Sequence, residues 1–125
     1  MGGTRDLLHS LFASAEEVAA HEERTQSAKD TSAVLIESAQ NRSHGTFAGV
    51  VRSVVFNPDL ERIRLEAELY DGSGALALVW LGRRSIAGVV PGSRMSVTGL
   101  VTLVNGRPVM YNPKYELKAK TGEAE

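Results

Sequence analysis

The chain has 125 residues, 42% of them hydrophobic, and a formal net charge of −1. This length suits one domain plus an extension, and the hydrophobic content is too high for wholesale disorder. The absence of cysteine excludes disulfides, thiolate metal sites and cysteine nucleophiles, and it fits the cytoplasmic location that we expect. No run reaches the roughly 18 apolar residues that span a bilayer, so we expect no membrane partner.

The charges are unevenly distributed along the chain. Residues 1–45 hold four Lys/Arg against seven Asp/Glu, and residues 46–118 hold nine against six. A mildly acidic arm thus precedes a mildly basic domain. The excess is small beside that of strongly basic nucleic-acid binders, so charge alone does not identify a partner.

The N-terminal arm, residues 1–45, contains one clear amphipathic pattern. Between residues 4 and 22 the apolar side chains recur at helical spacing, and Thr4 is a suitable N-cap. An isolated helix of this length is marginal in water, so its apolar stripe needs a partner. We favour packing on the same chain, with a homodimer through this helix as the alternative. For residues 33–39, periodicity does not distinguish a helical turn from a short strand.

From residue 46 onward, short β-branched runs alternate with turn residues about every ten positions, which is typical of an all-β domain. The second run alternates apolar and polar residues, which predicts one core face and one face for solvent or a ligand. The third is apolar throughout and predicts a strand covered on both sides. Asn105-Gly106 predicts a two-residue type I′ hairpin turn. The predicted strands are 46–56, 62–70, 75–81, 94–104 and 107–111.

The connector 82–92 has no strand pattern, although Ser85 could cap a single helical turn. Five short strands with one non-strand connector between the third and fourth match the OB layout. Gly49 and Gly99 lie inside the first and fourth runs, where a strand shared by both halves of a small barrel must bend. We therefore predict a mainly β fold: a five-stranded OB-type Greek-key barrel over 46–117, with an N-terminal helical extension and a flexible tail, 118–125.

The stretch 47–117 resembles the OB family that includes anticodon-binding domains, and more closely the wedge domain of RecG-type helicases. The resemblance rests on four pieces: Gly49-Val-Val with Arg52, Leu69-Tyr-Asp-Gly-Ser-Gly, Leu78-Val-Trp-Leu followed by Pro91-Gly92, and Val109-Met-Tyr-Asn-Pro-Lys-Tyr. The last piece is similar to the wedge ending, with Tyr111-Asn112 and Lys114 as departures. An arm followed by one such domain resembles small stand-alone actinobacterial proteins. The resemblance implies binding to single strands or junctions; the phosphate-binding loop of a helicase motor is missing from the sequence.

Catalytic groupings are sparse. His9, His21 and His44 show no metal-ligand spacing, and we expect His44 to be exposed. Asp71, beside Gly72-Ser73-Gly74, is expected to bond its own backbone in a turn. We therefore expect neither an enzyme nor a cofactor or metal.

Binding residues are better represented. Single strands are held by cations that follow the phosphates and by flat side chains on which bases stack. OB folds place such groups on the second and third strands and the adjoining loops. The candidates are Arg62, Arg64, Tyr70, Trp80, Arg83, Arg84, Arg107, Tyr111 and Lys114.

Several candidates have structural alternatives. Trp80 either stacks on bases or plugs the barrel end, and packing is slightly favoured for Tyr111. Glu66 and Glu68 oppose binding because they would repel phosphates. The favoured function is a non-catalytic protein for single-stranded or branched DNA, with RNA also open. The alternative is a protein-interaction module that docks or dimerises through the arm helix.

Overall fold

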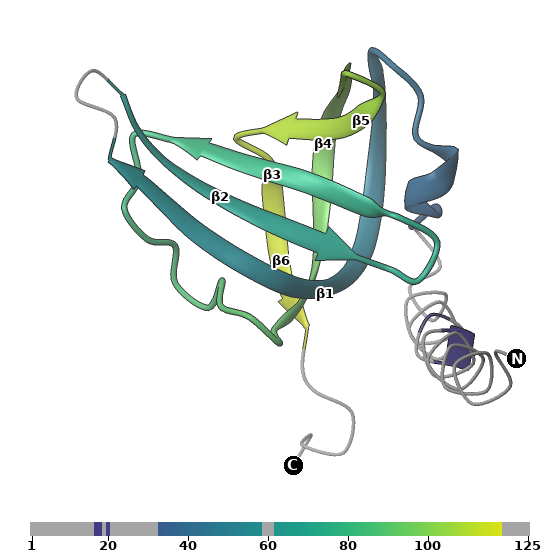
Figure 1. The fold of residues 1–125 in the computed structure, drawn as a ribbon, viewed down its shortest axis with the longest axis horizontal. Coiled ribbons are helices and arrows are strands. Elements are labelled where there is room, and N and C mark those ends of the chain that lie inside the picture. Colours follow the sequence, from purple (N-terminus) through teal and green to yellow (C-terminus); the bar gives the residue numbers. More distant parts are fainter. Residues whose placement is uncertain (1–16, 19, 21–32, 59–61, 119–125) are drawn as a thin grey trace, which may run out of the picture.

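The computed structural model describes residues 17–18, 20, 33–58 and 62–118. Of the helix predicted over 4–22, residues 17, 18 and 20 are described and helical, and the rest lies outside the described residues. The described remainder is a six-stranded sheet curled on itself (Figure 1). Its elements are the 3-10 turn η1 (Ile36–Ser38) and the strands β1 (Ser43–Pro58), β2 (Ile63–Tyr70), β3 (Ala75–Leu81), β4 (Arg94–Val104), β5 (Arg107–Tyr111) and β6 (Lys114–Lys118). No helix of this described part is long and apolar enough to cross a membrane.

Five of the strands form a barrel-like ring in the order β1-β2-β3-β5-β4, and β1 completes it by pairing with β4. The first half of β1 pairs with β4 and its second half with β2, both antiparallel. On the other side, β3 and β5 run parallel and pair over only three positions, so the ring is not evenly closed. The sixth strand, β6, pairs with β4 beyond the end of β5.

The bend in β1 depends on a close backbone approach. At Gly49, a Cβ atom would collide with the carbonyl oxygen of Tyr70, so only glycine fits there without a backbone shift. The register with β2 then slips between Val51 and Ser53, a β-bulge that increases the local twist. Gly99, in β4, is also crowded, since its Cβ would lie 3.1 Å from the Met110 sulfur. Both glycines therefore lie where the ring is tightest.

The β4–β5 turn agrees with its sequence. Asn105 has a φ of 53° and Gly106 a φ of 79°, which are the two positive values that a type I′ turn requires. The predicted bounds of β3, β4 and β5 are also those observed. β1 begins three residues earlier than predicted, and the undecided segment 33–39 contains the 3-10 turn.

Three predictions about the sheet were incomplete or wrong. The strand β6 was not predicted, although residues 114–118 alternate between polar and apolar side chains. β3 is covered on both sides only at Val79, which is 5% exposed, whereas Ala75 and Ala77 of its outer face are half-buried and Leu81 is exposed. The connector 82–92 forms a series of turns rather than the helical turn that Ser85 could cap.

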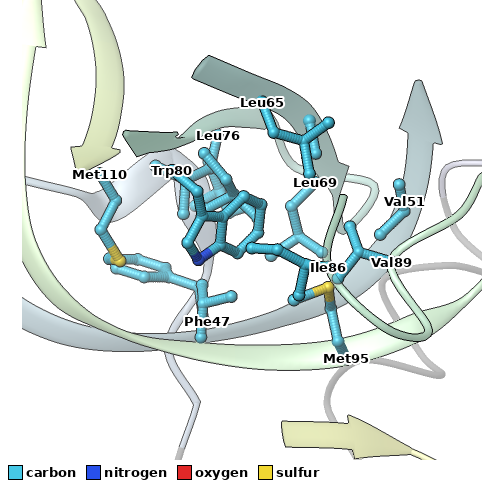
Figure 2. Packing of buried hydrophobic residues seen from close by; sticks show 14 of the residues in the cluster. Phe47, Val51, Leu65, Leu69, Leu76, Trp80, Ile86, Val89, Met95 and Met110 are labelled. Carbon is cyan, nitrogen blue, oxygen red and sulfur yellow. The ribbon is translucent and has the colours of Figure 1, made fainter. Parts of the chain in front are cut away.

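The hydrophobic core fills the ring (Figure 2). Inward positions alternate along each strand, so that Leu65 pairs with Trp80 and Leu69 with Leu76 across β2 and β3. The connector contributes Ile86 and Val89, both buried, and this burial explains how a segment without regular structure stays on the barrel. Burial of apolar surface therefore orders the connector before β4 as well as the strands.

Asp71, which was predicted to be a turn residue, has a second role. Its Oδ1 accepts hydrogen bonds from the Ser73 N–H (2.9 Å), the Ser73 hydroxyl (2.7 Å) and the Gly74 N–H (3.1 Å). Its Oδ2 accepts the Ile36 N–H at 2.8 Å. The carboxylate is 1% exposed and Ile36 is 2% exposed. The β2–β3 turn thus fastens η1 to the barrel, and the packed unit begins before residue 46.

Replacing Gly49 by alanine tests the bend in β1. We expect the Gly49→Ala variant to lose about 3 kcal/mol of unfolding free energy, because its Cβ meets backbone rather than a movable side chain. Gly99→Ala is the matched control and should cost less, since it meets the flexible Met110 side chain. Urea denaturation measures both. Equal losses would contradict the close approach at Gly49.

Removing the Asp71 carboxylate tests how strongly η1 is fastened. The Asp71→Ala variant leaves the buried Ile36 N–H without its acceptor, at a cost of about 1–3 kcal/mol for that group. Ser73→Ala removes a hydroxyl that donates to Asp71 and accepts the exposed Glu37 N–H at 3.1 Å. It should cost about 1 kcal/mol, because the exposed N–H can bond to water instead. Chemical denaturation compares the two variants. In amide hydrogen exchange, faster exchange at Ile36 is expected for Asp71→Ala alone, and an unchanged rate would argue against the proposed attachment.

Candidate nucleic-acid interface

The outer face of β2 and β3 presents alternating positions that do not enter the core. The cross-strand register aligns Val55 of β1, Glu66 of β2 and Val79 of β3 in one row. The parallel pairing of β3 with β5 extends this row to Tyr111. The middle of the face therefore combines one carboxylate with apolar side chains.

The two carboxylates of this face both have arginine neighbours. Glu68 Oε1 lies 2.7 Å from Arg52 Nη2 and accepts a hydrogen bond from Arg52 Nε at 2.8 Å. Glu66 lies farther from its partner, with 3.7 Å between its Oε2 and Arg64 Nε. That buried Nε has no hydrogen-bond partner. Arg52 is therefore firmly paired and Arg64 only loosely, and the four charges sum to zero.

Cations collect at one end of this face, where β2 begins and β3 ends. The Gly82 N–H donates to the Ile63 carbonyl oxygen at 2.7 Å, which joins the two strand ends. The Leu81 N–H donates to Asn112 Oδ1 at 3.0 Å, which brings in the end of β5. We call the cations carried by these ends the basic rim: Arg62, Arg64, Arg83, Arg84 and Lys114. The loop 59–61, whose sequence contains Asp59 and Glu61, lies outside the described residues.

Two aromatic rings lie at the same end as the basic rim. Tyr111, at the end of β5, is 51% exposed, so the packing role favoured from sequence is not the one observed. Phe56, near the end of β1, is 40% exposed, and the Arg84 guanidinium lies 6.0 Å from its ring centroid. Sequence reasoning missed Phe56 because its register position faces inward; the signal was its place near the strand end.

Two other predicted residues lie at the opposite end of the face. Tyr70 ends β2, so it lies about 26 Å along the strand from Arg62. Arg107 begins β5, and the parallel register of Val109 with Ala77 puts Arg107 level with the start of β3. The predicted residues therefore form two groups rather than one patch.

Trp80 belongs to neither group. It is 5% exposed and lies in the core, and its ring meets Tyr115 of β6 edge-on, with 6.0 Å between the ring centroids. Of the two alternatives for Trp80, the structure shows the packing one, because its inward register position directs the ring into the barrel. Trp80 is therefore removed from the candidate interface.

Apart from the residues described above, the candidates to consider are the histidine and groups of side chains that could bind a metal ion. His44 is exposed on β1, as expected. Within residues 33–58 and 62–118, no group of three or more His, Cys, Asp or Glu side chains is placed to hold a metal ion. What the arrangement offers a ligand is a set of guanidinium and ammonium groups beside exposed rings.

Comparisons with known proteins support the OB-type fold that the sequence predicts. No family model matches the chain, and no curated protein matches it significantly. Among solved structures, RecG bound to a three-way DNA junction is similar with a TM-score of 0.53 and 25% identity, over 66% of this chain and 12% of that chain. A replication protein A heterotrimer bound to single-stranded DNA is similar with a TM-score of 0.51 and 15% identity, over 73% and 69% of the two chains. The chain thus has an OB-type fold and spans a small part of RecG.

Truncation to alanine should lower the unfolding free energy strongly at Trp80 and hardly at all at Tyr111. Trp80→Ala removes a buried ring and should cost about 3–5 kcal/mol of unfolding free energy. Tyr111→Ala, at an exposed position, should change that energy by no more than about 0.5 kcal/mol. Urea denaturation measures both values. If Trp80→Ala does not fold, iodide quenching of the wild-type fluorescence tests whether Trp80 is buried. Trp80 is the only tryptophan in the sequence, and a buried ring resists quenching.

Proposed function

We propose that this protein binds single-stranded or branched DNA without catalysing a reaction on it, through the basic rim and the rings beside it. The observation that carries this proposal is that five cations are carried by segments whose strand ends meet at one end of the barrel, where the rings of Phe56 and Tyr111 are exposed. Cations that follow phosphates and rings that stack on bases are the two requirements for holding a single strand.

The charge of the barrel supports this assignment. Residues 33–118 carry ten Lys/Arg against seven Asp/Glu, and one of the seven, Asp71, is buried in its turn. The carboxylates on the outer face oppose binding less than their number suggests, because Glu68 is already paired with Arg52. Five of the ten cations belong to the basic rim, and we expect the phosphates to bind there.

The structural neighbours support the same ligand class. Both were solved with DNA, one with a three-way junction and the other with a single strand. The shared ligand is the reason to place single-stranded or branched DNA first and RNA second. The motor activity of a helicase is not part of the proposal.

A second candidate function is a protein-interaction module. The observation that favours it is the apolar surface beside Glu66, where Val55 is exposed in the same row and Leu81 and Tyr111 are exposed at the strand ends next to the basic rim. Arg84 also leans toward Phe56 rather than toward this central row. An apolar surface with a central carboxylate suits a protein partner better than phosphates.

Fluorescence anisotropy with labelled single-stranded, duplex and forked DNA separates the two functions. We expect binding to single-stranded or forked DNA that weakens as salt rises, because cations at the rim displace counterions from phosphates. The double variant Arg83→Ala/Arg84→Ala should bind more weakly, with a salt slope shallower by up to about 1.4, since each phosphate left without its cation lowers the slope by about 0.7.

The matched control is Arg42→Gln/Lys118→Gln, which removes two cations at exposed positions away from the basic rim. We expect its affinity to stay close to that of the wild type. Equal weakening in both double variants would show that only net charge matters and would contradict the rim. No wild-type binding at tens of micromolar protein in low salt would favour the protein-interaction module.

A further inference from the structure

Arg52 is displaced from the regular ladder of β1. It lies between Val51 and Ser53, where the register with β2 shifts, and a bulge of this kind redirects the side chain that it carries. The guanidinium carbon of Arg52 lies 3.9 Å from the centroid of the Tyr70 ring. The Arg52 side chain nevertheless remains 46% exposed. One face of the guanidinium is therefore supported by Tyr70, and a large part of the side chain is open to solvent.

Glu68 fixes this guanidinium in place. Both Arg52 Nε and Arg52 Nη2 approach Glu68 Oε1, at 2.8 and 2.7 Å. These contacts occupy two of the N–H donors that would otherwise bind a phosphate, and the Glu68 carboxylate offsets the positive charge of the guanidinium. What remains is the flat face of a side chain already held in one orientation, which lowers the entropy cost of binding.

The neighbouring strand leaves room beside this flat face. On β3, Ala77 pairs with Glu68 and Ala75 pairs with Tyr70, so no side chain larger than a methyl group projects there. Beyond β3, Arg107 lies level with Ala75 at the start of β5. A flat platform of Arg52 on Tyr70 thus adjoins a low strip of alanines with an exposed cation on its far side.

We propose that an unpaired base stacks on the open face of Arg52, with the adjoining phosphate near Arg107. This inference rests on the proposed function and adds a second binding point at the end of the face opposite the basic rim. The ligand must be an unpaired base, because bases inside a duplex have both faces covered by their neighbours. The Arg52–Tyr70 platform therefore selects single-stranded segments, whereas the basic rim recognises phosphates in any strand.

The decisive variant is Arg52→Lys, which keeps the positive charge near Glu68 and removes the planar group. Anisotropy with a labelled single strand of about 16 nucleotides, the upper end of OB site sizes, should give a Kd about 5- to 150-fold weaker, the factor expected when one stacked base loses its platform. The salt slope should not change, because the same phosphates remain bound by the same cations. Arg42→Lys is the control at another exposed arginine and should bind like the wild type.

A second pair of variants tests the ring beneath the guanidinium. Tyr70→Phe keeps the ring and should leave the Kd within about twofold of the wild type, whereas Tyr70→Leu removes the support and should weaken binding as Arg52→Lys does. Circular dichroism melting establishes that each variant is folded. If Arg52→Lys does not fold, the comparison of the two Tyr70 variants decides.

The outcomes distinguish this inference from the function on which it rests. No wild-type binding overturns the proposed function itself. Wild-type binding that Arg52→Lys leaves unchanged overturns the Arg52–Tyr70 platform alone, and the basic rim stands. Because lysine can also neutralise a phosphate, the salt slope is tested with Arg52→Met/Glu68→Gln, which removes both charges of the pair. A slope shallower than that of the wild type in this double variant also overturns the platform, because Arg52 would then be holding a phosphate. Weaker binding by Arg52→Lys, with an unchanged slope in the double variant, supports the stacked base.

Discussion

The pairing of β1 with two different strands is the constraint on which the rest of the structure depends. One continuous strand cannot lie along both β4 and β2 without a sharp turn, and the turn occurs where Gly49 passes the Tyr70 carbonyl. The bulge at Arg52 follows within three residues. The path of β1 therefore accounts both for closure of the ring and for the position of Arg52 outside the regular ladder (Figure 1).

The outer face combines two kinds of electrostatic environment. Near the bend, Arg52 forms an ion pair with Glu68 and lies over the Tyr70 ring. It therefore offers a ligand a flat surface more than a free charge. At the other end, the cations of the basic rim are exposed or, like Arg64, only loosely paired. In the proposed function, the basic rim binds phosphates at one end of this surface and Arg52 stacks on a base at the other. Modest net charge is compatible with such a surface, since the charges need not be numerous if they are grouped.

Much of the fold could be predicted because the signals are local. Asn105-Gly106 determines its own turn, and the alternation in β2 shows which residues face the core. Features that need a partner far along the chain were harder to predict. β6 exists because it pairs with β4, and Trp80 is buried because inward residues of other strands surround it. Grouping of the predicted cations depends on which strand ends meet. Arg52 had no local sequence signal for its role, and Phe56 had only its place near the end of a strand.

The fastening of η1 by Asp71 determines where the arm joins the barrel. Ile36 enters the core at the β2–β3 turn, one strand length from the basic rim, and its hydrogen-bond partner Asp71 directly follows Tyr70 in the chain. A mechanical load on the chain before residue 33 would reach the barrel first at the Val34 N–H, which donates to the Thr46 carbonyl oxygen at 2.9 Å, and then at the Asp71 carboxylate. The second attachment follows Tyr70 at the end of β2, so the tension there would act beside the Tyr70 ring, at the opposite end of the strand from the basic rim.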